Sequence, residues 1–212
     1  NREGRGFLLD FSPEINYHKH YINRYAFLFN EYIGNKYVYL PELSLRYTGQ
    51  KTFQFDNSHK TIALYLGGEN KEFRKYPDEY AVQLLRLLNR QGYNLLLIGD
   101  ENDNIKHTQY AEEARIDHLI NLTARTTIEG FINTIANVDL IITIDSSALH
   151  IAAAVKTPFI ALMGLSTSPT STILPKVPLG RILKIENNLI REEDYIRNIT
   201  PDLILKTISE LI

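Results

Sequence analysis

From residue 61 onward, short apolar runs alternate with longer segments in which apolar residues recur every three or four positions. The apolar runs predict strands at 62–66, 95–98, 118–122, 138–144, 158–162 and 181–185. The segments between them predict helices at 77–90, 127–136 and 201–212, a polar helix ending near 114 and a small-residue helix ending at 155. Uninterrupted apolar strands are typical of a parallel sheet that is covered on both faces. The pattern therefore predicts an α/β fold, a Rossmann-like parallel sheet of at least five strands with flanking helices.

The first sixty residues follow a different pattern, because they are rich in Tyr, Phe and His and show no strand–helix repetition. A strand is predicted at 7–11 and a helix with one apolar face at 20–32. The change in pattern predicts two parts, a preceding-domain remnant with its linker at 1–58 and an α/β domain at 59–212. Because the chain begins at Asn1 without a Met, we expect it to be a piece of a longer protein.

Composition narrows the functions that remain open. Lys and Arg total 23 against 25 Asp and Glu, so the overall charge does not favour a nucleic-acid partner. The absence of Cys excludes disulfides and thiolate metal sites. No signal-peptide pattern and no apolar run of ~20 residues is present, which predicts a cytoplasmic protein and leaves peripheral membrane association open.

Several known site patterns are missing or incomplete. No Gly-x-Gly-x-x-Gly motif follows a predicted strand, and no Walker phosphate loop occurs. The acidic run at 100–104 is followed by Ile105, where a calcium loop needs Gly for its tight turn. None of the six histidines has the paired spacing of a zinc site on a helix. We therefore expect neither a bound metal nor a dinucleotide cofactor.

Ligands of open parallel sheets bind beyond the carboxyl ends of the strands, where three loops of this chain carry suitable residues. The loop at 67–77 combines two glycines with three cations, which suits phosphate, although an exposed polar loop without a ligand would look the same. The turn at 145–150 opens a helix, whose N–H groups and dipole favour a diphosphate. Simple N-capping by Asp145 or Ser146 is the alternative there. The loop at 99–104 places a carboxylate where a ribose hydroxyl could be held.

In combination, these segments resemble glycosyltransferase family 9, the ADP-heptose lipopolysaccharide heptosyltransferases. The motifs that carry the resemblance are Leu66-Gly67-Gly68, Arg74-Lys75-Tyr76-Pro77, Leu97-Ile98-Gly99 and Asp145-Ser146-Ser147-Ala148-Leu149-His150, followed by the Ala-rich segment at 151–154. Their order and spacing agree with the family over about residues 60 to 175. Ser147 stands where the family usually has Gly.

The resemblance implies a two-domain GT-B glycosyltransferase of which this chain carries the C-terminal, donor-binding half. It implies donor contacts at Gly67, Gly68, Asn70, Arg74, Asp103, Thr126, Asp145, Ser146, Ser147, Ala148 and His150. In that assignment Arg74 contacts the donor phosphates. Asp103, or alternatively Glu101, holds the ribose, and Thr126 borders the adenine. The turn that begins at Asp145 holds the pyrophosphate and the sugar.

The implied reaction is inverting, metal-independent transfer of a heptose or related sugar from an ADP-sugar to a lipopolysaccharide or lipooligosaccharide core. No cofactor is implied, and the lipid-linked acceptor would be bound by the other domain, with peripheral contact to the inner membrane. The family's general base lies near the start of the N-terminal domain, so no catalytic residue is assigned here and the chain alone is expected to be inactive. Two alternatives are a non-catalytic nucleotide-sugar-binding module and a nucleotide-sugar epimerase of similar architecture. The Asp-Ser-x-x-x-His turn before an Ala-rich helix favours the transferase.

Overall fold

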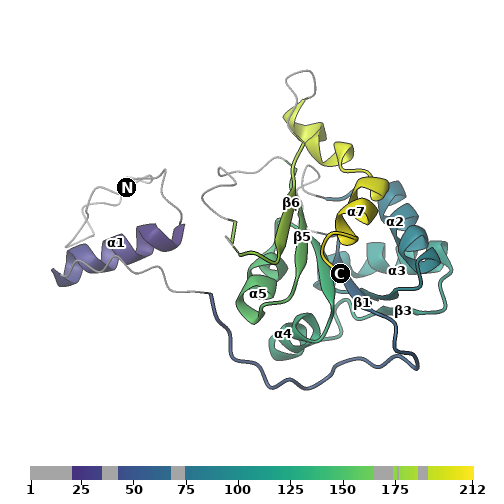
Figure 1. Ribbon diagram of the computed structural model, residues 1–212, viewed down its shortest axis with the longest axis horizontal. Helices are drawn as coiled ribbons and strands as arrows, with labels where there is room; N and C mark the ends of the chain where they lie inside the picture. Colours follow the sequence, from purple (N-terminus) through teal and green to yellow (C-terminus); the bar gives the residue numbers. More distant parts are fainter. Residues whose placement is uncertain (1–20, 35–42, 68–74, 165–173, 176, 186–190) are drawn as a thin grey trace. The chain divides into compact units, whose positions relative to one another are not determined.

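A computed structural model of the chain describes residues 21–34, 43–67, 75–164, 174–175, 177–185 and 191–212 (Figure 1). The chain divides into two compact units, the first made of Asn1–Glu42 with Thr167–Leu174 and the second of Leu43–Ser166 with Pro175–Ile212. Within the first unit the helix predicted at 20–32 forms α1 (Tyr21–Ile33). It ends at Gly34, whose φ of +68° is a conformation that glycine adopts without strain. The strand predicted at 7–11 lies outside the described residues.

The second unit is built on one sheet of six parallel strands. The strands are β1 (Thr61–Tyr65), β2 (Asn94–Leu97), β3 (Leu119–Asn121), β4 (Leu140–Ile144), β5 (Phe159–Leu162) and β6 (Gly180–Leu183). Their spatial order is β3-β2-β1-β4-β5-β6, the order of a doubly wound Rossmann-like sheet. The predicted fold class and the expectation of at least five parallel strands are confirmed.

Helices cover both faces of this sheet (Figure 1). The α-helices of the second unit are α2 (Asp78–Arg90), α3 (Asn104–Ala114), α4 (Ile128–Ala136), α5 (Ser147–Val155) and α7 (Pro201–Ile208). Two 3-10 helices, η3 (Glu101–Asp103) and η4 (Glu192–Asn198), precede α3 and α7. Helix α2 packs against α3 and α7 on one face, and α4 packs against α5 on the other.

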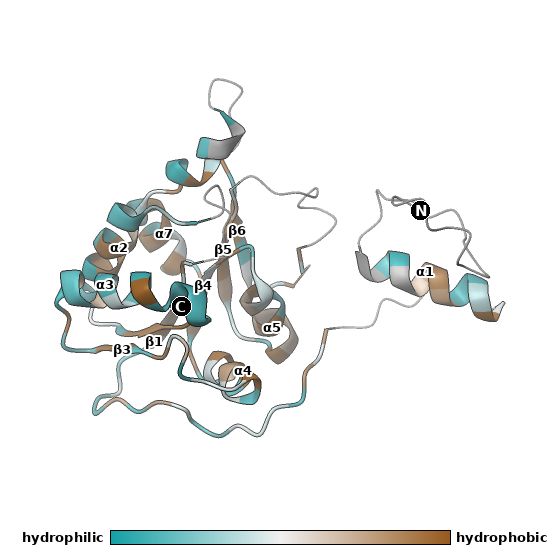
Figure 2. Cartoon of the chain, turned by 180° about the vertical axis from the view of Figure 1, so that it is seen from behind, coloured by the Kyte–Doolittle hydropathy of each residue, from teal (hydrophilic) through white to brown (hydrophobic). Residues whose placement is uncertain are grey.

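The core lies between the sheet and its two helical layers. Every residue of β1, β2, β4 and β5 is buried, whereas β3 and the other edge strand, β6, are only partly buried. Figure 2 shows the same division, with hydrophobic strands inside and hydrophilic residues concentrated on the helices and connections. Since a fully buried Leu or Ile side chain contributes roughly 2 kcal/mol, the four inner strands supply much of the stability of this unit.

The ends of several elements differ from the sequence prediction by a few residues. The closing helix was predicted to reach 212, but α7 ends at Ile208 and a turn follows. Helix η4 was not predicted, because residues 192–198 are polar and show no apolar period.

The segment at 43–60 is extended, and polar side chains of α4 attach it to the rest of the second unit. The Asn133 side chain is buried, accepts a hydrogen bond from Gly49 N at 3.1 Å and donates one to Thr48 Oγ1 at 2.8 Å. The hydroxyls of Thr52 and Thr134 lie 2.6 Å apart. These contacts join residues 48–52 to α4 within the second unit, which begins at Leu43. The division of the chain into domains at 58/59 stays a prediction.

Replacing Asn133 with Ala removes both hydrogen bonds to this extended segment and leaves Gly49 N without its partner. We expect Asn133→Ala to lower the free energy of unfolding by about 2 kcal/mol and to speed amide exchange at residues 48–52. Urea unfolding and hydrogen-exchange mass spectrometry measure the two effects. Glu112→Gln, a change at an exposed position of α3, should leave both unchanged. Unaltered exchange at 48–52 in a folded Asn133→Ala protein would rule out this attachment.

Candidate functional site at the carboxyl edge of the sheet

The strand order reverses between β1 and β4, and this reversal defines the candidate site. The two strands are hydrogen-bonded neighbours, with Tyr65 in register with Thr143. The helix that follows β1 covers one face of the sheet and the helix that follows β4 covers the other (Figure 1). The chain therefore leaves these two neighbouring strands toward opposite faces of the sheet, and open α/β sheets bind ligands at the carboxyl ends of such a pair of strands. At this edge Gly67 lies just beyond the end of β1, and Asp145 directly follows the neighbouring strand, β4.

The connection from β1 to α2 is fixed at its two ends. Tyr76 N donates to Leu66 O at 3.4 Å, which closes the base of the connection. The Tyr76 ring is buried, and its hydroxyl donates to Ile199 O at 2.8 Å. Burial also raises the pKa of this hydroxyl, so it stays a donor. Of the predicted donor contacts in this connection, Gly67 is described, while Gly68, Asn70 and Arg74 lie outside the described residues.

Asp103, the predicted ribose ligand, is buried between the connections that follow β1 and β2. A Cβ atom on Gly67 would lie 1.8 Å from Asp103 Oδ1, and one on Gly99 would lie 2.7 Å from Asp103 Oδ2. The two glycines thus provide the space that this carboxylate occupies. Asp103 Oδ2 also accepts a hydrogen bond from Asp100 N at 3.3 Å, in a capping box at the start of η3. The structure brings Asp103 and Gly67 together, and contact with a ribose stays a prediction.

The turn after β4 is capped by Ser146. Its hydroxyl accepts a hydrogen bond from Ala148 N at 3.2 Å and lies 2.9 Å from Thr143 Oγ1. Ala148 is buried, whereas Ser147 and His150 are exposed in the first turn of α5. The capping interpretation of this turn is therefore correct for Ser146. Capping uses the hydroxyl as an acceptor and does not decide whether the turn also binds phosphate.

Thr126 lies at the far end of the same edge, half-buried in the connection from β3 to α4. Its neighbour Thr127 caps α4 by accepting a hydrogen bond from Gly130 N at 3.1 Å. The described candidate residues thus follow β3, β2, β1 and β4, in the order in which these strands lie in the sheet. Three strand spacings span about 14 Å, which suits an elongated ligand rather than a single phosphate.

His107 helps to hold the connection after β3 at this edge, and the sequence analysis did not identify it. Its ring is buried on α3, and Nδ1 lies 2.7 Å from Thr123 Oγ1. Nε2 has no hydrogen-bond partner among the described residues. Burial lowers the pKa of His107 to about 4, against the opposing effect of the Asp100 charge. A neutral imidazole therefore joins α3 to the connection after β3, where Ala124 N donates to Gly99 O at 3.1 Å.

The opposite edge of the sheet holds a separate polar cleft of about 820 Å³. It is lined by the segment at 51–59 and by Thr61, Asn94, Asn137 and Asp139 at the amino ends of the strands. None of the predicted donor contacts lines it. Within the described part of the chain, no three His, Asp or Glu side chains gather as metal ligands, and no helix is long and apolar enough to cross a membrane.

A doubly wound parallel sheet with its candidate residues at the strand-order reversal defines a Rossmann-like α/β domain. The profile of glycosyltransferase family 9 (heptosyltransferase) matches residues 2–193. The chain belongs to this family, as its motifs indicated.

Known relatives agree with this assignment. The lipooligosaccharide heptosyltransferase 2 of Haemophilus influenzae is 31% identical over 158 residues, which cover 69% of this chain and 45% of that protein. A family 9 glycosyl transferase of Veillonella parvula superposes with a TM-score of 0.77 at 17% identity, over 94% of this chain and 62% of that one. The heptosyltransferase WaaC of Escherichia coli, solved with ADP, gives a TM-score of 0.71 at 15% identity over 97% of this chain and 61% of its own. The chain spans about half the length of the curated relatives it matches.

Removing the Ser146 hydroxyl tests the cap of α5 directly. We expect Ser146→Ala to lower the free energy of unfolding by about 1 kcal/mol, because Ala148 N loses its acceptor. Chemical denaturation measures the loss. Ser147→Ala removes a neighbouring exposed hydroxyl and should change stability by less than about 0.5 kcal/mol. Equal effects of the two substitutions would be inconsistent with the cap.

The buried His107 should make stability depend on pH. An unfolded His titrates near pH ~6.5, whereas His107 in the folded chain has a pKa of about 4. As the pH falls through this window, the unfolded chain takes up a proton first, so stability is complete above pH ~6.5 and declines toward pH ~4, by up to about 3 kcal/mol. Urea unfolding at several pH values measures the decline. His107→Gln should flatten it, whereas His118→Gln, at an exposed position, should not. An equally steep decline in His107→Gln would contradict this account.

Proposed function

We propose that the chain is the donor-binding half of an enzyme that transfers a heptose or related sugar from an ADP-sugar to a lipopolysaccharide or lipooligosaccharide core. Membership of family 9 and the relatives named as heptosyltransferases support the sugar and the acceptor. The ADP in the WaaC structure supports the nucleotide. The observation that carries the proposal is the alignment of Thr126, Asp103, Gly67 and Asp145 along one sheet edge, across the strand-order reversal.

The order of these residues suggests how the donor lies. The adenine would be next to Thr126 and the ribose next to Asp103 or the exposed Glu101. The diphosphate would lie between Gly67 and the N–H groups of the turn at 146–148, and the sugar beside Asp145 and His150. Gly68, Asn70 and Arg74 enter this arrangement from the family resemblance alone.

The chemistry proposed for this arrangement is direct displacement at the anomeric carbon. An acceptor hydroxyl forms a new bond to that carbon while the bond to the diphosphate oxygen breaks, and the bonding electrons leave with the diphosphate. The helix N–H groups at 146–148 and the Arg74 guanidinium would stabilise the charge that develops, by roughly 3 kcal/mol for each well-placed donor. No metal or cofactor is part of this proposal. The base that accepts the hydroxyl proton is assigned to a domain outside this sequence, so the chain would bind the donor without turning it over.

The proposal also assigns the parent enzyme to the cytoplasm, where nucleotide sugars are the donors. Its acceptor is a lipid-linked oligosaccharide, so the enzyme would work at the inner membrane surface by peripheral association.

Binding of ADP compared with adenosine tests the function. We expect the chain to bind ADP more tightly than adenosine, because only ADP carries the diphosphate. Arg74→Ala should weaken ADP by about tenfold or more through the loss of charge-assisted hydrogen bonds, and should leave adenosine unchanged. Calorimetry or NMR titration measures both ligands. Lys51→Ala removes a cation at the opposite edge of the sheet and serves as the control. Absence of any response to ADP or UDP at roughly millimolar concentration, where even ligands worth only about 4 kcal/mol bind, would remove the basis of the proposal.

A further inference from the structure

The connection from β3 to α4 begins with a tight turn at Leu122–Arg125. Arg125 N donates to Leu122 O at 3.0 Å, which closes the turn, and Ala124 has a φ of +58°. A turn with a positive φ at its third residue normally has Gly or Asn there, because most side chains make this backbone conformation unfavourable. Ala124 therefore adopts a conformation that its own side chain disfavours, and contacts with neighbouring elements must hold it.

Two backbone hydrogen bonds attach this turn to the end of β2 and the loop that follows it. Leu122 N donates to Leu97 O at 2.8 Å, and Ala124 N donates to Gly99 O at 3.1 Å. Any residue except Pro could make these bonds, so they do not depend on the side chains of the turn. The second bond also joins the turn to the loop that carries Asp103, the predicted ribose ligand.

A side-chain contact attaches the same turn to α3. Thr123 and His107 are both fully buried, and Thr123 Oγ1 lies 2.7 Å from His107 Nδ1. His107 Nε2 has no hydrogen-bond partner in the part of the chain that the structure describes, so the polar pairing of the ring there is with Thr123. Burial lowers the pKa of His107 to about 4, so the imidazole is neutral at pH 7. A neutral ring either accepts from the hydroxyl or donates to it, and both forms are a single directed hydrogen bond.

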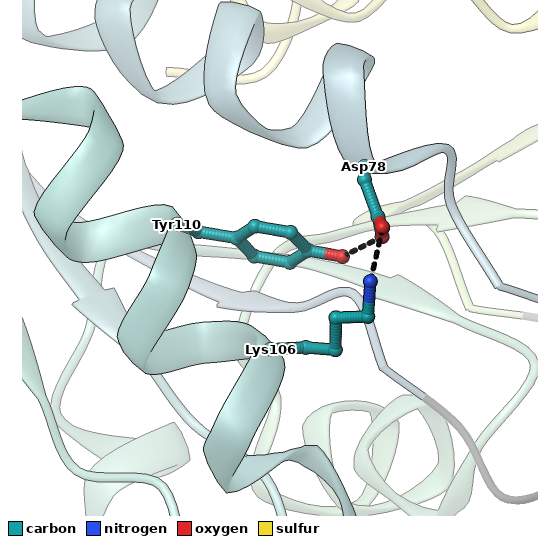
Figure 3. Close-up of polar contacts among 3 residues, drawn as sticks. All are labelled: Asp78, Lys106 and Tyr110. Carbon is teal, nitrogen blue, oxygen red and sulfur yellow. Dashed lines mark hydrogen bonds and ion pairs between the residues drawn. The ribbon is translucent and has the colours of Figure 1, made fainter.

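Helix α3 makes a second, separate set of polar contacts, with the start of α2. The Tyr110 hydroxyl donates to Asp78 Oδ1, and the Lys106 ammonium donates to Asp78 Oδ2 (Figure 3). The buried residues of α3 are His107, Tyr110 and Ala114, so two of the three have polar groups that bind a neighbouring element. The contacts of α3 with α2 and with the turn involve different residues and can therefore be removed independently.

Thr126, the residue assigned to the adenine, directly follows this turn and is half-buried. We propose that Thr123 and His107 are positioning residues for the nucleotide base, because their hydrogen bond holds the turn from which Thr126 follows. This inference rests on the proposed function, in which Thr126 borders the adenine. Groups that recognise a ligand need contacts behind them that fix their position, since a loosely held group loses affinity and selectivity. The contact should therefore affect recognition of the base and not recognition of the rest of the nucleotide.

The test measures the affinities of ADP and UDP for the unaltered chain and its variants, by calorimetry or NMR titration. The two ligands carry the same ribose and diphosphate, so the ratio of their affinities reports recognition of the base alone. We expect the unaltered chain to prefer ADP. Thr123→Val keeps the shape of the side chain and removes its hydroxyl. It should lower the ratio of ADP affinity to UDP affinity about three- to tenfold, the size of one lost hydrogen bond.

Thr123→Ser is the matched variant, because it keeps the hydroxyl and removes only a methyl group. We expect it to keep the ADP-to-UDP affinity ratio of the unaltered chain to within about twofold, since the hydrogen bond to His107 is retained. If Thr123 acted only through apolar packing, the Ser variant would lose more of the ratio than the Val variant. That result, or an equal loss in both variants, would contradict the positioning role.

The double variant His107→Phe/Thr123→Val separates positioning from stability. Thr123→Val alone leaves a buried imidazole nitrogen without its partner and should lower the Tm. Replacing both partners by apolar groups of similar shape should restore much of the Tm, because no buried polar atom of the pair is then left unpaired. The ADP-to-UDP affinity ratio should stay low, because an apolar contact has no preferred direction. A ratio that recovers together with the Tm would show that the pair acts through stability alone, and the positioning role would be wrong.

Tyr110→Phe is the control for a general loosening of α3. It removes a hydrogen bond from this helix to Asp78 and keeps the aromatic ring, whose centroid lies 5.8 Å from that of His107. The contact of His107 with Thr123 stays intact, so the ADP-to-UDP affinity ratio should change by less than about twofold. A loss as large as that of Thr123→Val would mean that any weakening of α3 lowers the ratio, which would overturn the positioning role.

The outcomes separate this inference from the function on which it rests. If the unaltered chain binds neither nucleotide, or binds ADP no better than UDP, the proposed ADP-sugar donor and the positioning role both fail. If the unaltered chain prefers ADP and Thr123→Val keeps the same ratio of affinities, the function stands and the positioning role is wrong. A lowered ratio in Thr123→Val and in the double variant, absent in Thr123→Ser and Tyr110→Phe, supports it.

Discussion

Burial of both faces of the parallel sheet is the constraint on which the rest of this structure depends. Since α2, α3 and α7 cover one face and α4 and α5 the other, the inner strands are mostly apolar, and their buried polar residues are Thr61 and Asn94 at the start of β1 and β2 and Thr143 near the end of β4. Polar chemistry is thereby confined to the two edges, where the strands end and the backbone turns. At the carboxyl edge the direction of all six strands brings four connections together, and the reversal between β1 and β4 separates two of them. The candidate site is a consequence of the buried sheet.

The polar groups that are nevertheless buried hold these connections in place. Asp103 lies against two glycines, Tyr76 reaches the backbone of Ile199, and His107 joins Thr123. Each is a long-range contact, and each ties one connection to a neighbouring element rather than strengthening a helix or strand internally. A buried polar group costs free energy unless it is paired, so such contacts accept little displacement. Precision at the carboxyl edge thus comes from buried hydrogen bonds, whereas the stability of the unit comes from the apolar strands.

The same division explains what the sequence could and could not predict. Periodicity located β1, β2, β4 and β5 within one or two residues, because burial on both faces leaves an uninterrupted apolar run. A carboxylate in the loop after β2 could be predicted, and the family resemblance singled out Asp103 or Glu101, but the packing of Asp103 against Gly67 involves residues 36 positions apart and has no local pattern. The attachment of 48–52 to Asn133 is equally non-local, and an isolated His such as His107 has no motif. The sequence therefore predicted the secondary structure, but it could not predict the contacts between residues far apart in the chain.

Ser147 shows how a departure from the family pattern can leave the fold unchanged. The family usually has Gly at this position, which suggests a backbone that only Gly adopts or a close approach by a ligand. Among the described residues, the non-glycine positions with positive φ are Arg115, Ala124 and Lys156, so Ser147 has an ordinary helical backbone at the start of α5. Its side chain is exposed, and the cap of the helix is made by Ser146. Backbone strain therefore does not explain why the family has Gly at this position. Close approach by a ligand is the other explanation. In the proposed donor arrangement, the Ser147 hydroxymethyl group projects from the turn that faces the sugar, so this substitution would alter the space for the sugar and leave the diphosphate contacts as they are.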